Sequence, residues 1–362
     1  MNTSHSRRDF LSTSAIASLG LLSAGKLFAQ EAKPKADERL GFFLISDTHY
    51  LAQAEAPTKL DEVSQATNAR LVDTLNRLAG TEIPAAAGGG NVLTPRGVIH
   101  GGDLIDSGDK NGPAHAPRWP TEWAGFAEDF GLNGGDGRLK YPVYEVHGNH
   151  DSPRGDGLVV KNIMARNKKR AGLKNVSENS LHYSWDWGPL HMVNLGISVG
   201  PAASTMKTRR YNPLDSLPFL IEDLVKNVGE SGRPVVLVHH LDIARYSAPP
   251  ADPSHELSRE WDSNDVGGYY AALQKYNIIA ILYGHTHVRN IMKWNGTPKK
   301  ADTGLTLFNV DNSGHFGSKT QSLFYFEYSP KELTVREYTT ADRWETGSWT
   351  PQTWTSPVKT MN

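Results

Sequence analysis

The sequence contains no cysteine, which excludes disulfide bonds, thiolate metal sites and a lipid-modified N-terminal cysteine. Any metal ion bound by side chains must therefore be held by histidine, carboxylate or amide groups. A strong charge of either sign is also missing. The formal net charge is −1, so the charge of the whole chain favours neither nucleic acid nor an anionic membrane surface as a partner. The chain has 362 residues, 38% of them hydrophobic, and 34 glycines, which is typical of a globular α/β protein with many loops.

No apolar run near the N-terminus is long enough to span a membrane. A mild run covers residues 15–25, which is shorter than the ~18 residues that a spanning helix needs. Arg7-Arg8 precedes this run, and Leu27-Phe28-Ala29 follows it with a small residue at the expected cleavage position. The segment resembles a bacterial twin-arginine export signal. The resemblance implies a periplasmic or secreted protein with the twin-arginine export machinery as a partner; a basic N-terminal extension and an uncleaved anchor are the alternatives.

Five short apolar runs are each followed by polar residues that can bind a metal. The runs are four to seven residues long, are rich in Val, Ile, Leu or aromatic residues, and are bounded by turn residues, which predicts strands buried on both faces. They cover residues 41–45, 97–100, 141–147, 234–238 and 278–283. Binding sites in open α/β sheets form at the carboxyl ends of the strands, so we expect these polar residues to meet.

Helical spacing of apolar residues separates the predicted strands. The helices are expected at residues 60–78, 217–228 and 266–276, and two hairpins at residues 182–195 and 323–338. This pattern predicts an α/β fold with two packed mixed β-sheets flanked by helices, a four-layer α/β/β/α sandwich. We expect a signal peptide at residues 1–29, a linker at 30–38, one catalytic domain at 39–342 and a C-terminal tail at 343–362.

The predicted strand ends carry a set of oxygen and nitrogen donors that suits two metal ions. The set is Asp47, His49, Asp103, Asn149, His239, His285 and His287. These donors favour ions such as Mn, Zn or Fe. A catalytic site for one ion uses three or four protein ligands, so two ions sharing one carboxylate fit the set better. Pairs of ions of this kind clamp an in-line displacement at phosphorus.

The order of the motifs resembles the calcineurin-like metallophosphoesterase family. The motifs are Asp-x-His, Gly-Asp-x-x-Asp, Gly-Asn-His-Asp, His-His and Gly-His-x-His, and they extend from Asp47 to His287. The resemblance implies a metallophosphoesterase fold, two divalent metal ions, a phosphate-ester substrate and a metal-bridging hydroxide as the nucleophile.

The resemblance also implies a role for each motif residue. The first ion would be held by Asp47, His49 and His287. The second would be held by Asn149, His239 and His285. Asp103 would bridge the two ions. His150 would stabilise the phosphoryl oxygens or protonate the leaving group, and Asp151 would orient His150.

Several assignments have alternatives. His239 is chosen over His240 because the family's histidine directly follows the strand, and alternation sends His240 the other way. Asp106 is interpreted as a hydrogen-bond acceptor that shapes its loop, and His315 as a loop residue that could reach the rim of the site. Phosphate needs cationic donors beyond the metals, which makes Arg154 and Arg245 the candidates for substrate binding.

The reaction class admits three hypotheses. An exported phosphoesterase is the first, with a phosphomonoesterase favoured over a phosphodiesterase. An extracellular nuclease is the second; a basic run at residues 161–174 would then be a patch for a polyanion rather than a solvated helix face, but the near-neutral chain leads us to expect no nucleic acid. A metal-binding scaffold without catalysis is the third, and the presence of His150 and all seven donors disfavours it.

Overall fold

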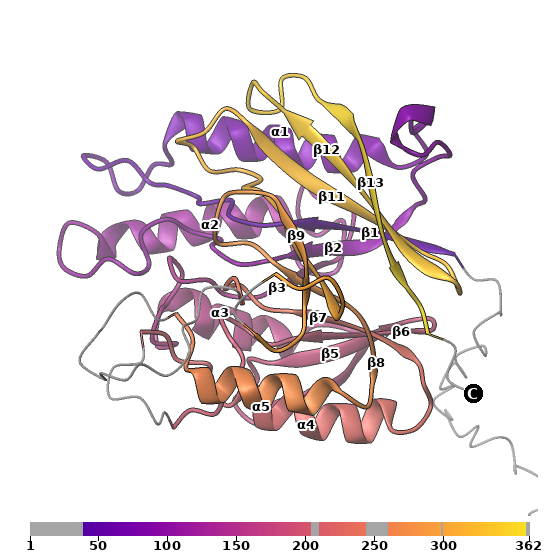
Figure 1. The fold of residues 1–362 in the computed structure, drawn as a ribbon. Coiled ribbons are helices and arrows are strands. Elements are labelled where there is room, and N and C mark those ends of the chain that lie inside the picture. The colour runs from indigo at the N-terminus through magenta and orange to yellow at the C-terminus, as the bar shows by residue number, and fades with distance from the viewer. Residues whose placement is uncertain (1–38, 204–209, 244–259, 298–299, 360–362) are drawn as a thin grey trace, which may run out of the picture. The chain divides into compact units, whose positions relative to one another are not determined.

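The computed structural model describes residues 39–203, 210–243, 260–297 and 300–359 (Figure 1). All of them belong to the unit formed by residues 34–362. The expected signal peptide and most of the expected linker, residues 1–38, lie outside the described residues, as does Arg245. No helix within the described ranges is long and apolar enough to cross a membrane.

Two mixed β-sheets form the centre of this unit. The strands of the first sheet are, in spatial order, β13 (Ser348–Pro357), β12 (Glu332–Thr340), β11 (Gln321–Tyr328), β1 (Leu40–Ile45), β2 (Pro95–His100) and β3 (Val143–Glu145). Those of the second are β4 (Leu173–Val176), β5 (Tyr183–Trp187), β6 (Leu190–Asn194), β7 (Pro234–Val238), β8 (Asn277–Tyr283), β10 (Leu305–Asn309) and β9 (Asn290–Trp294). The neighbours β1, β2 and β3 are parallel, as are β6, β7, β8 and β10; the other pairs are antiparallel.

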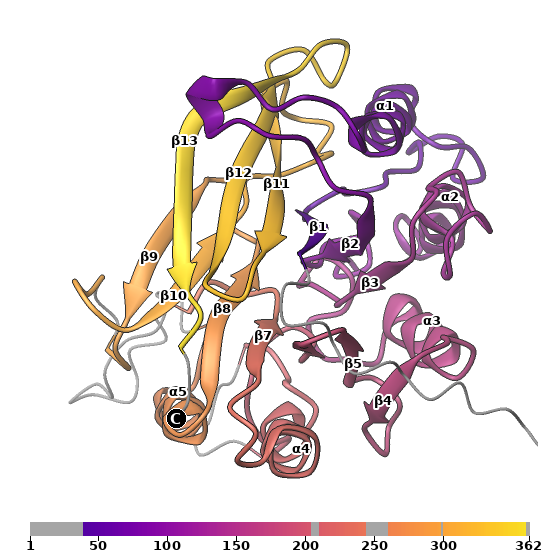
Figure 2. The same ribbon diagram turned by 90° about the vertical axis from the view of Figure 1, so that its right-hand side faces the viewer.

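Side-chain alternation along the strands separates three layers of core. Phe42 of β1 lies in the cluster between the two sheets together with Val236 of β7. Phe43, the next residue, lies in the cluster under helices α1 (Glu62–Leu78), α2 (Trp119–Phe130) and α3 (Leu158–Asn167). On the other side, α4 (Ser216–Asp223) and α5 (Ser263–Leu273) cover the second sheet (Figure 2). The predicted four-layer α/β/β/α fold is confirmed.

The predicted helices are present with small changes at their ends. Helix α1 begins where Asp61 accepts a hydrogen bond from Ser64 N, and the chain leaves it through Gly80 at a φ of 78°. Helix α4 ends at Asp223, and the chain continues through Leu224–Val228 as a π-helix rather than as the single helix expected to residue 228.

Several elements were not expected from the sequence. They are the helix α2 and the strands β4, β9, β10 and β13, whereas α3 overlaps the basic run that was considered as a helix face. Strand β13 lies within the segment expected as a C-terminal tail and forms the edge of the first sheet beside β12.

Candidate metal centre

The carboxyl ends of β1, β2 and β3 lie side by side because these strands are parallel neighbours, and the same holds for β7 and β8 in the second sheet. The loops after β1 and β2 are joined by hydrogen bonds from Asp47 N to Gly102 O, 2.9 Å, and from His49 N to Asp103 O, 3.1 Å. The loop after β8 joins them where His285 N donates to Asp47 Oδ2 at 3.0 Å. Both sheets therefore contribute side chains to one place.

The backbone at this place has an unusual conformation. The φ angles are 57° at Asp47, 44° at His49, 52° at Asp103, 76° at His285 and 51° at His287. Residues with a Cβ rarely adopt this left-handed region, and such strain of ~1–3 kcal/mol per residue concentrates at functional sites. Five of the ten described non-glycine residues with a positive φ are thus predicted metal ligands, and these five meet at one place.

A first cluster of donors consists of Asp47, His49 and His287. The two Nε2 atoms of His49 and His287 face each other at 3.2 Å, and Asp47 Oδ1 lies 3.2 Å from His287 Nε2. Nδ1 of His49 lies 3.3 Å from Asp106 Oδ1 and donates its hydrogen to it, because a carboxylate can only accept. His49 therefore presents an Nε2 lone pair to the cluster, as a metal ligand must.

A second cluster consists of Asp103, Asn149, His240 and His285. His240 Nε2 lies 3.2 Å from Asp103 Oδ2 and 3.1 Å from Asn149 Oδ1, while its Nδ1 donates to Gly101 O at 2.7 Å. The rings of His240 and His285 are 5.0 Å apart. Nε2 of His285 lies 3.0 Å from Glu260 Oε2, so the hydrogen is on Nε2 and the lone pair is on Nδ1.

Asp103 connects the two clusters. Its Oδ2 atom lies 3.2 Å from His240 Nε2 in the second cluster and 3.7 Å from His49 Nε2 in the first. One carboxylate oxygen thus faces both clusters, which is the arrangement expected of a bridging ligand. In His49, His240 and His285 one ring nitrogen donates its hydrogen to an oxygen acceptor, which leaves the lone pair of the other nitrogen for a metal. This donor set fits two metal ions.

The prediction that His239 faces the centre is corrected. Its ring is buried, stacks on Tyr283 at 5.7 Å and lies 5.2 Å from Trp261, and burial lowers the pKa of His239 to about 3. The prediction that His239 and His240 point to opposite sides of the sheet was correct, but the clusters lie on the side of His240. Val235 and Leu237 face the helices α4 and α5, and His239 continues their side, whereas His240 continues the side on which the clusters form.

The role expected of Asp151 is also corrected. Its buried carboxylate accepts hydrogen bonds from Leu104 N, Ile105 N and Gly148 N, at 2.9, 3.0 and 2.7 Å, so it holds the loops after β2 and β3 together. The hydrogen on Nδ1 of His150 goes instead to Asp106 O at 2.9 Å. His150 N donates to Asp103 Oδ1 at 2.7 Å, and its ring lies 4.7 Å from that of His49.

The clusters attract cations. Burial disfavours the charge of Asp47, but His287 and His49 outweigh it and lower the pKa of Asp47 well below its ordinary value. Burial likewise disfavours a charged His240, yet the charge of Asp103 raises the pKa of His240 to about 9. Since metal ligands must be deprotonated, metal ions compete with protons for these sites.

Three residues near the clusters were missed or undervalued by the sequence analysis. Asp106 fixes the hydrogen of His49, and Glu260 does the same for His285. His315 lies with its ring 4.6 Å from His49 and 4.9 Å from His287, and burial lowers the pKa of His315 to about 4. Asp106 had a usable signal, since it is the last residue of the Gly-Asp-x-x-Asp motif. Glu260 belongs to no motif, and His315 follows β10, a strand that was not expected.

The candidates for substrate binding remain predictions. Arg154 is exposed, three residues beyond Asp151.

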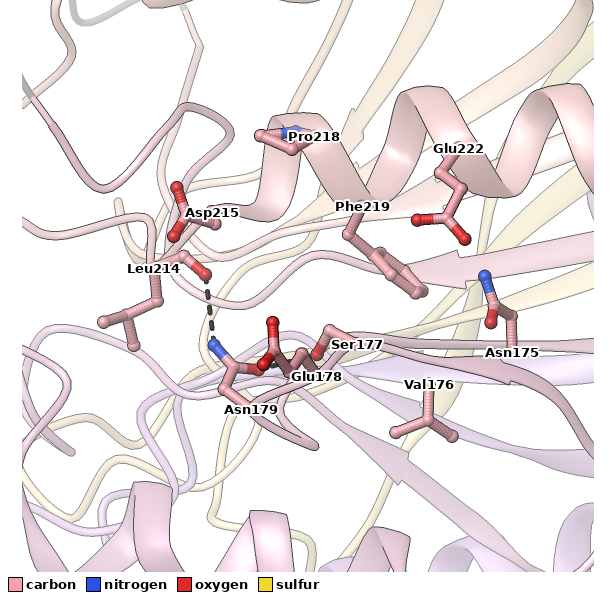
Figure 3. Close-up of a pocket in the computed structure, with 10 residues that line it drawn as sticks. All are labelled: Asn175, Val176, Ser177, Glu178, Asn179, Leu214, Asp215, Pro218, Phe219 and Glu222. Atoms are coloured by element: carbon pink, nitrogen blue, oxygen red, sulfur yellow. Dashed lines mark hydrogen bonds between the residues drawn. The ribbon is translucent and has the colours of Figure 1, made fainter.

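A separate pocket between the β4–β5 turn and the start of α4 contains none of the predicted ligands (Figure 3). It is lined by Glu178, Asp215 and Glu222, and Asn179 donates to Leu214 O there at 3.2 Å. These carboxylates repel a phosphate group, so this pocket does not suit the substrate.

The fold and the paired clusters define a protein with a candidate two-metal centre between two β-sheets. The particular family follows from the sequence: the model of the calcineurin-like phosphoesterase family matches residues 40–289, and the chain belongs to this family of metal-dependent phosphoester hydrolases. The family predicted from the motifs is thereby confirmed. No curated protein matches the sequence.

Solved structures with a similar fold include three phosphoesterases. A purple acid phosphatase from yellow lupin (Lupinus luteus) seeds is 12% identical with a TM-score of 0.52, over 89% of this chain and 54% of its own. A dimetal phosphatase from Danio rerio is 14% identical with a TM-score of 0.49, over 88% and 99%. A calcineurin-like phosphoesterase from Bacillus subtilis is 13% identical with a TM-score of 0.40, over 89% and 91%. At these identities the lupin enzyme supports the fold alone.

Proposed function

We propose that the protein is an exported phosphomonoesterase that acts in the periplasm or outside the cell. The observation that carries the phosphoesterase assignment is the position of Asp103 Oδ2 between His49 Nε2 and His240 Nε2, at 3.7 and 3.2 Å. The first ion would be held by Asp47, His49 and His287. The second would be held by Asn149, His240 and His285. Asp103 would bind both.

The reaction divides between the ions and the side chains around them. When bound, two metal ions polarise the phosphoryl group and lower the pKa of a coordinated water toward neutrality. His150 has its Nδ1 hydrogen committed to Asp106 O, and its side chain is 30% exposed, so Nε2 is the nitrogen that can meet a substrate. In its protonated form His150 donates a proton to the leaving-group oxygen.

A monoester is favoured over a nucleic acid by the environment of the basic run at residues 161–174. Arg166 Nε donates to Glu145 Oε1 at 2.7 Å, and Arg170 Nη2 lies 2.8 Å from Glu145 Oε2. Both guanidinium groups therefore turn toward the buried end of β3 and not toward a polyanion. The lysines of the run are exposed, but without these two arginines the run offers a polymer a weaker basic surface along which to bind its backbone.

The experiment that tests the proposal uses the mature protein, residues 30–362. The protein is stripped with a chelator and titrated with Mn or Zn while hydrolysis of p-nitrophenyl phosphate and bis-p-nitrophenyl phosphate is followed. We expect activity to return near two equivalents of metal and the monoester to react faster. Faster hydrolysis of the diester would reverse the choice of substrate class, and two bound metals with neither activity would refute the proposal.

Export is supported by the sequence of residues 1–29 alone. The Arg7-Arg8 pair is the recognition element of a twin-arginine signal, so replacing both residues with lysine is expected to leave the protein in the cytoplasm. Fractionation of bacterial cells that express the two forms measures this. A double-lysine variant that reaches the periplasm as well as the original would contradict the twin-arginine assignment.

A further inference from the structure

The loop after β10 is fastened to the loop after β1. Ser313 N donates to Ser46 O at 2.8 Å, Ser46 N donates to Ser313 Oγ at 3.2 Å, and Gly314 N donates to Asp47 O at 3.4 Å. A Cβ on Gly314 would lie 2.1 Å from Asn68 Oδ1, so only glycine allows this approach. The residue that follows is His315, and its position is therefore fixed by the loop that carries Asp47 and His49.

The far side of the same loop is braced as well. Trp344 Nε1 donates to Ser313 O at 2.7 Å, and Arg343 Nη2 donates to Phe316 O at 3.3 Å. Ser318 N donates to His315 O at 3.1 Å, and the ring of His315 stacks on Phe316 at 4.6 Å. The ring is held at the centre by packing and hydrogen bonds on both sides, and its place does not depend on a metal.

The hydrogen bonds of the ring decide what His315 can do. Gly317 N donates to His315 Nδ1 at 3.0 Å. A nitrogen that accepts carries no hydrogen, so the hydrogen of the neutral ring is on Nε2. An Nε2–H group has no lone pair for a metal ion. His315 is thus a hydrogen-bond donor, whereas His49, His240 and His285 each present a lone pair to the centre.

A metal ion held by His315 is disfavoured on a second ground. A nitrogen of His315, a nitrogen of His49 and an oxygen of Asp106 lie within 4.8 Å of one another, which resembles a metal cluster. However, Nδ1 of His49 donates to Asp106 Oδ1, and the Nε2 lone pair faces His287. His49 has no further lone pair to give, so this third cluster does not hold an ion of its own.

We propose that His315 binds the phosphoryl group of the substrate through its Nε2–H group. The ring lies 4.6 Å from His49, and the ring of His150 lies 4.7 Å from the same histidine. Two histidines that are not ligands thus flank one ligand of the first ion. His150 must be protonated before its Nε2 can donate, whereas His315 donates as the neutral ring. His150 would therefore protonate the leaving group, and His315 would donate a hydrogen bond to a phosphoryl oxygen. This assignment rests on the proposed function.

The test compares His315→Leu, which removes the donor at similar size, with His315→Gln, which keeps an N–H group. Each protein is loaded with Mn, its metal content is measured, and its binding of inorganic phosphate is measured by calorimetry. We expect two metals in all three proteins. A hydrogen bond to a charged group contributes ~1.5–3 kcal/mol, so His315→Leu is expected to bind phosphate roughly 10- to 100-fold more weakly. His315→Gln is expected to recover most of that loss.

Two results would overturn the role of His315. One is the loss of a metal equivalent from His315→Leu, which would make the residue a ligand. The other is unchanged phosphate binding with both metals retained. Failure of the proposed function is a separate result: unsubstituted protein that binds phosphate but hydrolyses neither nitrophenyl ester would refute the phosphatase, while the same calorimetry still decides what His315 does.

Discussion

At the scale of single residues, the partner of one ring nitrogen determines the use of the other. The Nδ1 hydrogen of His240 is donated to Gly101 O, and that of His49 is donated to Asp106 Oδ1. In His285 the Nε2 hydrogen is donated to Glu260. Sequence motifs identified His49 and His285 because their spacing carries the information. They could not identify Glu260, which has no motif, and they chose the wrong residue in the His239-His240 pair because the side of the sheet was not known.

The pair His239 and His240 provides a matched test. His240→Ala is expected to lose the second metal and most activity, since loss of even an indirect metal contact costs 10–100-fold in affinity or rate. His239→Leu is expected to keep both metals and about equal stability, because neither buried ring nitrogen of His239 makes a hydrogen bond of ordinary geometry within the described residues. Metal analysis and urea unfolding of both variants measure this; loss of metal from His239→Leu alone would restore the original assignment.

His150 offers a second test at this scale. Because its ring touches the centre without presenting a donor to either cluster, His150→Ala is expected to retain two metals and to lose roughly 10²–10⁴ in kcat, the usual contribution of a general acid. The loss should shrink with a substrate whose leaving group needs no proton, such as p-nitrophenyl phosphate compared with an alkyl phosphate. An equal loss with both esters would argue against proton donation.

At the scale of elements, the strands of the site were predictable and the helices beside them were less so. The strands before the metal motifs are short apolar runs, and all five were expected. Helix α2 was missed because two of its inward positions are acidic. The two positions are Glu122 and Asp129, which are buried beside Phe126 and Phe130 and interrupt the apolar spacing of the helix. Glu122 accepts hydrogen bonds from Ala52 N and Ser107 N, each at 3.1 Å.

Strand β3 and the turn after helix α3 are joined by a buried ion pair, Glu145 with Arg170, that yields a prediction. The side chain of Arg170 is 1% exposed and that of Glu145 is fully buried. Glu145→Gln would leave the charge of Arg170 without its partner and is expected to lower the free energy of unfolding by about 3–5 kcal/mol. Urea unfolding measures the loss. The exposed Glu178→Gln is the control, with an expected change within about 0.5 kcal/mol; equal effects would contradict the assignment.

The same ion pair gives a dependence on pH. Burial opposes the charge of Glu145, but Arg166 and Arg170 outweigh it and lower the pKa of Glu145 in the folded chain. A lowered pKa means that the stabilisation is complete above the ordinary value of 4.5 and is lost as the pH falls through the folded value. The difference in stability between the protein and Glu145→Gln is therefore expected to narrow below pH 4.5.

At the scale of the whole molecule, the candidate ligands that the structure brings together come from both sheets. Asp47, Asp103 and Asn149 follow strands of the first sheet, whereas His240 and His285 follow strands of the second. The sequence predicted this meeting from the order of the motifs and from the rule for strand ends. It could not predict the closing strand β13, because the segment after residue 343 is rich in Thr, Trp and Pro and has no regular apolar alternation.

Removal of the metals is therefore expected to weaken the contact between the sheets. A metal that binds only the folded chain adds about 2.7 kcal/mol of stability when its free concentration is 100 times its Kd. The midpoint of thermal unfolding should fall when a chelator is added and should recover with Mn or Zn. His240→Ala, which lacks one ligand, should show a smaller change; an unaltered midpoint in the unsubstituted protein would contradict metal binding at the sheet junction.

The left-handed backbone at five ligand positions also bears on how the chain can change. Glycine would relieve the strain at Asp47, His49, Asp103, His285 or His287. A lineage that no longer needed the reaction would thus gain by drifting toward glycine at these places. The aspartates and histidines at these places therefore supply ligands at a cost in stability.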